Sequence, residues 1–269
     1  MYPWRRILIP TDFSTASEWA FDDAIQIAGS TAAELIILHV RMTERAHPEA
    51  LKFPADDAVY EYAEKFELDK LRDRARRANS TVQTRLVVKM APRAGEEICK
   101  TARDEDVDLI VIATHARHHV AHLLIGSTTI SVLGDPPAPV LAIRYGISKR
   151  RGMKRIVVPV HTKQTSDAAA DLASAVARRE GSEVHLLSVC PDADRSAAEA
   201  RVQTVAERMT GANVKRAIIR GNDVEEGLAK YVKDTNADVV FVNAQKEIGS
   251  VKKDIIRQIR VPVMSVPAR

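Results

Sequence analysis

A glycine and three hydroxyl side chains stand together where the residue pattern predicts the start of a helix. They are Gly126, Ser127, Thr128 and Thr129, and nine residues separate them from the segment Ala113–Ala116. Backbone amides at a helix N-terminus, beside a glycine and a hydroxyl, suit a phosphate group. The chemistry indicated is binding of a phosphorylated ligand, although a Gly-Ser pair before a helix also occurs as a simple cap.

Four of the eight histidines lie within the same connection, at positions 115, 118, 119 and 122. This cluster consists of His115, His118, His119 and His122. Its spacings of three and four residues place imidazoles on one side of a helical turn, as a metal site requires. The cluster contains neither cysteine nor acidic residues, and Arg117 lies within it. An exposed segment or a phosphate contact is favoured over a zinc site, so no metal site is assigned.

Sequence patterns of the common catalytic sites are absent from the chain. No G-x-x-x-x-G-K-(S/T), G-x-S-x-G or H-E-x-x-H pattern occurs. His39 and Cys99 are interpreted as structural residues, and Asp108 and Asp238, each just before an apolar run, are expected to accept hydrogen bonds from nearby backbone amides. No set of nucleophile, base and orienting residue can be assembled, so the sequence predicts no enzyme.

The elements that position these residues occur twice. The run Arg6–Asp12 returns as Arg155–His161, and Glu34–Val40 returns as Glu183–Val189, both with an offset of 149 positions. Two further apolar pairs follow in the same order, at 108–112 with 238–242 and at 139–143 with 262–266. A period of this length is typical of a duplicated globular domain, and we predict domains at residues 1–146 and 153–269.

Each copy alternates continuously apolar strands with amphipathic helices, which predicts an α/β fold with a parallel sheet buried on both faces. Five strands per copy fit a Rossmann-like, doubly wound sheet, where ligands bind beyond the carboxyl ends of the strands. A first helix is expected to begin at a Ser14 cap and to end at Gly29-Ser30. The other expected helices cover residues 54–79, 95–104, 127–133, 165–179, 193–209 and 223–234.

Composition indicates a cytoplasmic globular protein without membrane insertion. Hydrophobic residues make up 45% and charged residues 28%, and the N-terminus runs directly into a strand without a signal peptide. Cys99 and Cys190 lie in different copies, which favours free thiols. Six positive charges between Arg144 and Arg155 confine the basicity to the linker, and an aromatic content of 4% disfavours a nucleic-acid surface.

Together, the run Ile7–Asp12, Val40, Gly126-Ser127 and the final Pro-Val strands resemble a tandem universal stress protein over nearly the whole chain. The resemblance implies two adenine nucleotide alpha hydrolase-like domains and a G-x2-G-x9-G-(S/T) motif around the phosphates of ATP, with Mg²⁺ accompanying the nucleotide. It also implies that Asp12 and Val40 face the adenine and ribose. The implied binding residues are Pro10, Thr11, Asp12, Val40, Ile112, Ala113, His115, Ala116, Gly126, Ser127, Thr128 and Thr129.

The chain departs from that motif in both copies. Ala113 and Ala116 replace the first two glycines; a methyl group at a position of positive φ costs about 1 kcal/mol, and two such changes lower affinity by about tenfold to a hundredfold. In the second copy His161 replaces the aspartate, and residues 243–250 leave no room for nine intervening residues. We expect that copy to bind no nucleotide.

The resemblance implies a stress-response protein whose N-terminal copy alone binds adenine nucleotide. A scaffold that binds only protein partners and a weak ATPase are the alternatives. The resemblance further implies that the final strands, 139–144 and 262–266, pair antiparallel across a pseudo-twofold axis. The two copies would then form an internal pseudo-dimer. The resemblance also implies that two chains associate as a homodimer.

Overall fold

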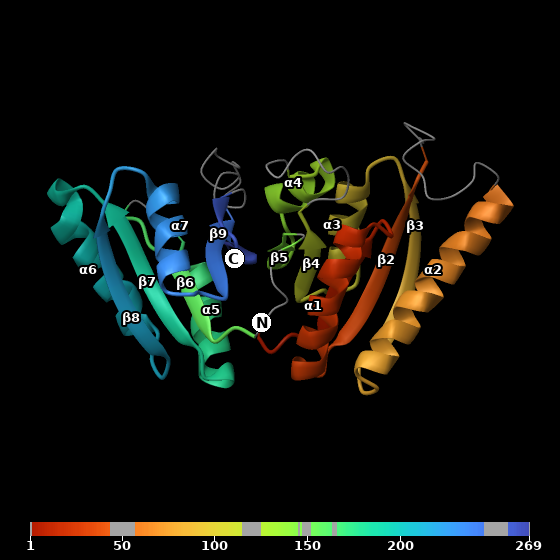
Figure 1. Cartoon of the computed structure of the whole chain (residues 1–269), viewed down its shortest axis with the longest axis horizontal. Helices are drawn as coiled ribbons and strands as arrows, with labels where there is room; N and C mark the ends of the chain where they lie inside the picture. Colours follow the sequence, from red (N-terminus) through yellow and green to blue (C-terminus); the bar gives the residue numbers. More distant parts are fainter. Residues whose placement is uncertain are drawn as a thin grey trace.

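Ten strands form one continuous sheet across the described part of the chain, in the order β3-β2-β1-β4-β5-β10-β9-β6-β7-β8 (Figure 1). The structure is a computed structural model, and it describes residues 2–43, 57–114, 125–144, 146, 152–162, 166–244 and 258–268. Neighbouring strands run parallel within each half of the sheet. The expected α/β class and the two-part organisation are confirmed.

The two halves repeat one order of elements. The first half contains β1 (Arg6–Thr11), α1 (Thr15–Thr31), β2 (Glu34–Met42), α2 (Asp57–Ala78), β3 (Thr84–Ala91), α3 (Ala94–Asp104), β4 (Leu109–Ala113), α4 (Ser127–Gly134) and β5 (Val140–Ile143). The second contains β6 (Arg155–Pro159), α5 (Ala168–Glu180), β7 (Glu183–Cys190), the 3-10 turn η2 (Asp192–Asp194), α6 (Arg195–Arg208), β8 (Asn213–Arg220), α7 (Val224–Asp234), β9 (Val239–Ala244) and β10 (Val263–Pro267).

Helices cover both faces of the sheet because its strands are apolar on both faces. Side chains of α1, α2, α5 and α6 share one apolar core with one face of the sheet, and this core extends across both halves. Side chains of α3, α4 and α7 pack against the other face. Burial on both faces explains why the strands read as unbroken apolar runs and not as alternating patterns.

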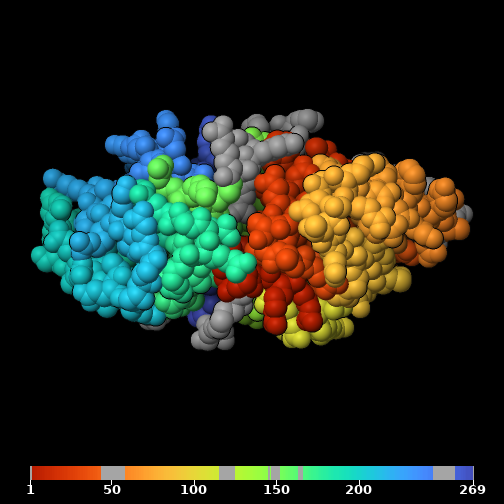
Figure 2. Space-filling view, turned by 90° about the horizontal axis from the view of Figure 1, so that it is seen from below, coloured from red at the N-terminus to blue at the C-terminus, as the bar shows by residue number. Residues whose placement is uncertain are grey.

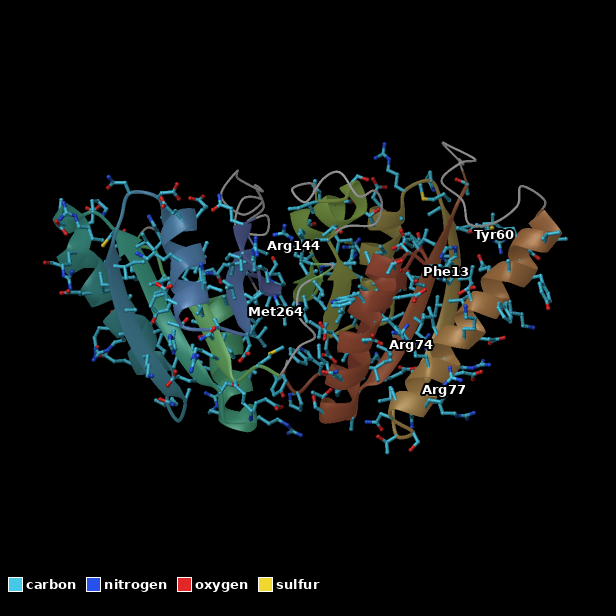
Figure 3. The ribbon with its side chains drawn as sticks, viewed as in Figure 1. Phe13, Tyr60, Arg74, Arg77, Arg144 and Met264 are labelled. Atoms are coloured by element: carbon cyan, nitrogen blue, oxygen red, sulfur yellow. The ribbon has the colours of Figure 1, made fainter. Side chains whose placement is uncertain are left out.

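The halves join through their last strands. β10 pairs with β5 in the antiparallel direction, with Met264 opposite Leu141, and this pairing confirms the predicted internal contact. Both side chains are fully buried in the core shared by the two halves. Figure 3 shows Met264 near the middle of the molecule. An edge that would otherwise expose backbone groups is therefore closed within one chain.

The N-terminal segment adds a second contact between the halves. The Tyr2 hydroxyl donates a hydrogen bond to the carboxylate of Glu180, at the end of α5. The neighbouring Trp4 is buried and meets the Tyr2 ring edge to face, with 4.7 Å between the ring centroids. Figure 2 shows one elongated body in which the N-terminal residues (red) meet the second half (green) at its middle.

Helix α1 confirms its predicted start and contradicts its predicted end. The Ser14 hydroxyl caps the helix by accepting a hydrogen bond from the Ser17 amide at 3.2 Å. The helix continues through Gly29 to Thr31, and Ala32 forms the left-handed cap at φ 55°. A side chain at Gly29 would meet the Asn79 amide at 2.4 Å, so this glycine allows close packing and does not end the helix.

Two further expectations concern the cysteines and the membrane. Cys99 and Cys190 are buried free thiols, and burial raises the pKa of both. Within the described residues, no helix combines the length and the apolar character that crossing a bilayer requires.

Candidate functional site

The predicted binding residues of the first half gather at one end of its sheet. β1 lies between β2 and β4, so the carboxyl ends of these strands, near Thr11, Val40 and Ala113, are neighbours. Helix α4 begins beside the end of β4, on the upper side of the molecule in Figure 1. The structure therefore brings the described members of the predicted set to one edge. His115 and Ala116, with the rest of the histidine cluster, lie outside the described residues.

Two hydrogen bonds to side chains hold the loop after β1. The Thr11 hydroxyl accepts a hydrogen bond from the Phe13 amide at 3.0 Å, and the Asp12 carboxylate accepts one from the Ser14 amide at 3.1 Å. Phe13 has a φ of 58° and is buried. A left-handed conformation at a residue with a Cβ costs about 1–2 kcal/mol, and buried packing holds it in place. These hydrogen bonds and this packing hold the backbone at Thr11-Asp12 in place.

The start of α4 is tied to the end of β4. The Thr129 hydroxyl donates a hydrogen bond to the Ala113 carbonyl at 2.8 Å, and the Gly126 amide donates one to the Thr114 carbonyl at 3.0 Å. Gly126 stands at the cap position of the helix and has no side chain to accept from the first-turn amides, while Ser127 is exposed. This is the arrangement that an anion at a helix N-terminus requires.

The conformation of Gly126 does not itself demand glycine. Its φ of −61° and ψ of 148° suit any residue, and among the residues that the structure describes a Cβ atom there would approach only the Thr114 carbonyl, at 4.0 Å. A small side chain at this position would therefore clash with none of the described residues. Ala113 is the last residue of β4, so its backbone is extended and its methyl group causes no positive-φ strain.

Sequence reasoning missed a buried polar network next to this site. The His39 Nδ1–H donates to the Thr11 carbonyl at 2.9 Å, which leaves Nε2 to accept from the Tyr60 hydroxyl of α2 at 3.0 Å. The His39 ring also packs against Phe13, with 4.5 Å between centroids. Phe13 and Tyr60 both lie in the upper part of the first half in Figure 3. His39, expected to be structural, thus links the β1 end to α2.

An ion pair continues the network along β2. The Arg41 guanidinium donates to both carboxylate oxygens of Glu64, at 3.2 Å and 3.0 Å, and to Glu61 at 3.0 Å. It also lies over the Tyr60 ring, 5.1 Å from the centroid. These hydrogen bonds, those to Glu64 above all, raise the pKa of Arg41. These contacts therefore hold helix α2 against the end of β2, where Val40 lies.

We expect the stability of the protein to fall between pH 7 and pH 5 in a way that depends on His39. Burial lowers the pKa of His39 below its usual value of about 6.5, against the opposing effects of the Thr11 carbonyl, Glu64 and Asp12. The unfolded chain then binds the proton first, so stability is lost from about pH 6.5 downward. Thermal unfolding of His39→Asn, which keeps a donor toward Thr11, should show a smaller loss over this range. An identical loss in both proteins would contradict the assignment.

Gly95 allows α3 to approach α4 closely. A Cβ atom at Gly95 would lie 2.5 Å from the Ser131 side chain and 3.2 Å from the Thr128 carbonyl. Gly95→Ala should therefore destabilise the protein by about 1–3 kcal/mol, as overpacking does, and displace the start of α4. Gly126→Ala is the matched control, because its methyl group would come no closer than 4.0 Å to any atom of the described residues outside its own neighbours in the chain. Equal melting temperatures for the two variants would contradict this packing.

The second half differs from the first at the same strand ends. Asn243 takes the place of Ala113, and its side chain accepts from the Ala169 amide at 2.8 Å and donates to the Ser166 carbonyl at 2.7 Å. It therefore reaches the start of α5, the helix that follows β6. The paired positions Ile110 and Val140 are 30 residues apart in the first half, whereas their counterparts, Val240 and Val263, are 23 apart. The connection that holds Gly126 is thus shorter in the second half.

Other features recur in both halves as expected. The Asp108 carboxylate accepts hydrogen bonds from the Arg5 and Arg6 amides at 2.9 Å and 3.1 Å, and Asp238 accepts from the Arg155 amide at 2.7 Å. These aspartates anchor the starts of β1 and β6, as predicted. Among the residues that the structure describes, no three histidine, cysteine or acidic side chains gather as metal ligands.

A duplicated, parallel α/β sheet with a helix N-terminus beside the ends of β1 and β4 defines the adenine nucleotide alpha hydrolase-like class. The model of the universal stress protein family matches residues 3–144 and again residues 152–267. The chain therefore belongs to the universal stress protein family and carries its domain twice.

Individual relatives agree with a tandem arrangement. Universal stress protein MJ0577 from Methanocaldococcus jannaschii is 28% identical over 158 residues, which cover 52% of this chain and 95% of that protein. A universal stress protein from Archaeoglobus fulgidus superposes with a TM-score of 0.75 at 21% identity, covering 98% of this chain and 96% of the other. A putative universal stress protein from Pseudomonas aeruginosa gives a TM-score of 0.67 at 14% identity, over 99% and 94%. The two structural likenesses show the fold.

Proposed function

We propose that the N-terminal half binds one adenine nucleotide, ATP with Mg²⁺, as part of a cytoplasmic stress response. The observation that carries the proposal is the uncapped start of α4 at Gly126, held beside the ends of β1 and β4 by the Thr129 and Gly126 hydrogen bonds. First-turn amides and the hydroxyls of Ser127 and Thr128 are the groups that bind phosphate there. The family resemblance supports adenine and ribose near Asp12 and Val40.

Three differences support restricting the nucleotide to the N-terminal half. The Asn243 side chain occupies the space between the end of β9 and the start of α5, where Ala113 has only a methyl group. The connection after β9 is shorter, and His161 stands in the place of Asp12. These differences support the absence of a phosphate-binding turn like that of the first half from the second half.

We further propose that the chain binds nucleotide without catalysing its hydrolysis. The described groups nearest to the site are already engaged, since His39 bonds to Thr11 and Tyr60 and Asp12 accepts from the Ser14 amide. Timed release of inorganic phosphate from ATP tests this directly. Phosphate release that Gly126→Val abolishes would replace the binding proposal with a weak ATPase.

The proposal also includes association of two chains as a homodimer. The inner edges of the half-sheets pair with each other, so a second chain must use another surface, and β3 and β8 are the outer edges of the sheet. Light scattering on the purified protein tests this association. A mass of one chain at every concentration would contradict it.

Mass spectrometry of small molecules released from freshly purified protein tests the ligand class. We expect an adenine nucleotide at a substantial fraction of the protein concentration in the wild type and its loss in Gly126→Val. If neither protein releases a nucleotide and neither binds added ATP, the alternative of a scaffold that acts through protein partners is the correct one.

A further inference from the structure

Two arginines from different halves of the chain lie together where β5 and β10 meet. Arg144 directly follows β5, and Arg260 lies shortly before the start of β10. Because Met264 lies opposite Leu141, the same antiparallel register brings Arg144 opposite Val261, the neighbour of Arg260. The two guanidinium groups are close enough for their positive charges to repel each other. Figure 3 shows Arg144 in the middle of the molecule, where the halves join.

A chain of backbone hydrogen bonds connects this place to the start of α4. The Ile143 carbonyl accepts a hydrogen bond from the Thr114 amide at 2.9 Å, and the Thr114 carbonyl accepts one from the Gly126 amide at 3.0 Å. Arg144 is the next residue after Ile143. The arginine pair and the first turn of α4 are therefore neighbours.

Packing on both sides of Arg260 holds it near α4. Ile259 is buried, Val261 is half-buried, and both pack in the apolar cluster on the face of the sheet that α3, α4 and α7 cover. Ile125, the residue before Gly126, belongs to the same cluster. Arg260 itself is exposed. Its segment is thus anchored on the same face of the sheet as the start of α4, while its charge stays accessible to a ligand.

The arginine pair occurs on one side of the join between the halves. The correspondence of residues 139–143 with residues 262–266 makes Pro267 the counterpart of Arg144 and Pro137 the counterpart of Arg260. Neither proline carries a charge. The two positive charges therefore lie on the side of the join next to Gly126, and their counterparts on the other side are neutral. This asymmetry matches the one between the two halves at the helix start.

Two guanidinium groups held near each other suit an anion with several negative charges. Partial burial, together with repulsion from Arg260, lowers the pKa of Arg144, but an arginine in a protein keeps its proton. A multiply charged anion between the two groups replaces their repulsion with attraction. Guanidinium groups also form paired, charge-assisted hydrogen bonds with phosphate oxygens. A polyphosphate chain is the ligand that this chemistry favours.

We propose that Arg144 and Arg260 bind the terminal phosphates of the nucleotide, so that the second half supplies a residue to the site of the first half. This assignment rests on the proposed function, which places the phosphates at the start of α4. The first-turn amides of α4 then bind the phosphate chain from one side, and the two arginines bind its end from the join between the halves. The pair favours ATP over AMP, because AMP lacks the terminal phosphates.

Calorimetry on the full chain with ATP and with AMP tests this assignment. Arg260→Gln changes an exposed residue, so the fold should persist, and it should weaken ATP binding about tenfold through the loss of charge-assisted hydrogen bonds. AMP should bind Arg260→Gln as it binds the wild type. Arg260→Lys should lose less ATP affinity than Arg260→Gln, because lysine keeps the charge without the paired hydrogen bonds.

Arg77→Gln is the matched control. Arg77 is an exposed arginine in the last turn of α2, in the lower part of Figure 3, whereas α4 begins on the upper side of the molecule. The control removes the same charge from the chain and should bind ATP as the wild type does. Equal weakening of ATP and AMP by Arg260→Gln, or equal weakening of ATP by Arg77→Gln and Arg260→Gln, would overturn the assignment.

Inorganic tripolyphosphate, titrated in the same way, separates this assignment from the proposed function. If Gly126→Val abolishes ATP binding and Arg260→Gln leaves it unchanged, the proposed function stands and the role of the arginine pair is refuted. If the wild type binds tripolyphosphate but no ATP, and Arg260→Gln weakens the tripolyphosphate, the pair is a polyphosphate site and the proposed function is wrong. If the wild type binds neither ligand, both are wrong.

Discussion

Met264→Asp is expected to lower the free energy of unfolding by about 4 kcal/mol or more, because it places an unpaired charge in a fully buried position. Met264 lies opposite Leu141 in the antiparallel pair that joins the halves, and both belong to the core that the halves share. In a chain of this length such a loss lowers the melting temperature by roughly 10 °C. Thermal unfolding followed by circular dichroism measures it.

Met90→Asp provides the control for this substitution. Met90 lies on the outer strand β3 and is 64% exposed, so the same change should alter stability by no more than about 0.5 kcal/mol. If the two variants unfold at the same temperature, the pairing of β5 with β10 is not the contact that unites the halves.

Gly126→Val is expected to remove ATP binding while the fold persists. The backbone at Gly126 suits a β-branched residue, and within the described part of the chain a Cβ atom there approaches only the Thr114 carbonyl, at 4.0 Å. The valine methyl groups would instead extend over the first-turn amides of α4 and hold a phosphate away from them. We expect at least a tenfold loss of affinity, about 1.4 kcal/mol, with a small change in melting temperature.

Gly126→Ala refines the same test. Its single methyl group should weaken ATP binding less than the valine side chain does, because it takes less space from the ligand. A Gly126→Val protein that binds ATP as tightly as the wild type would show that the start of α4 does not face the phosphates.

Much of the fold could be predicted because the chain repeats itself. The offset of 149 positions that relates the first two strands of each copy reappears in the strand register, where Arg6 lies opposite Glu34 and Arg155 opposite Glu183. Unbroken apolar runs indicated strands covered on both faces. The antiparallel pairing of the last strands was predicted from the family resemblance, because the composition of an edge strand does not specify the strand with which it pairs.

The missed features depend on tertiary contacts. His39 and Tyr60 meet across 21 positions, and neither residue type marks that contact in the sequence. The end predicted for α1 at Gly29 was wrong because that glycine serves packing against Asn79.

Isothermal titration of the full chain with Mg-ATP tests the central claim most directly. The asymmetry between Gly126 at an open helix start and Asn243 bonded to the start of α5 predicts one nucleotide per chain. Binding close to one per chain, lost in Gly126→Val, is the expected result. Two nucleotides per chain, or one that Gly126→Val does not affect, would contradict the account.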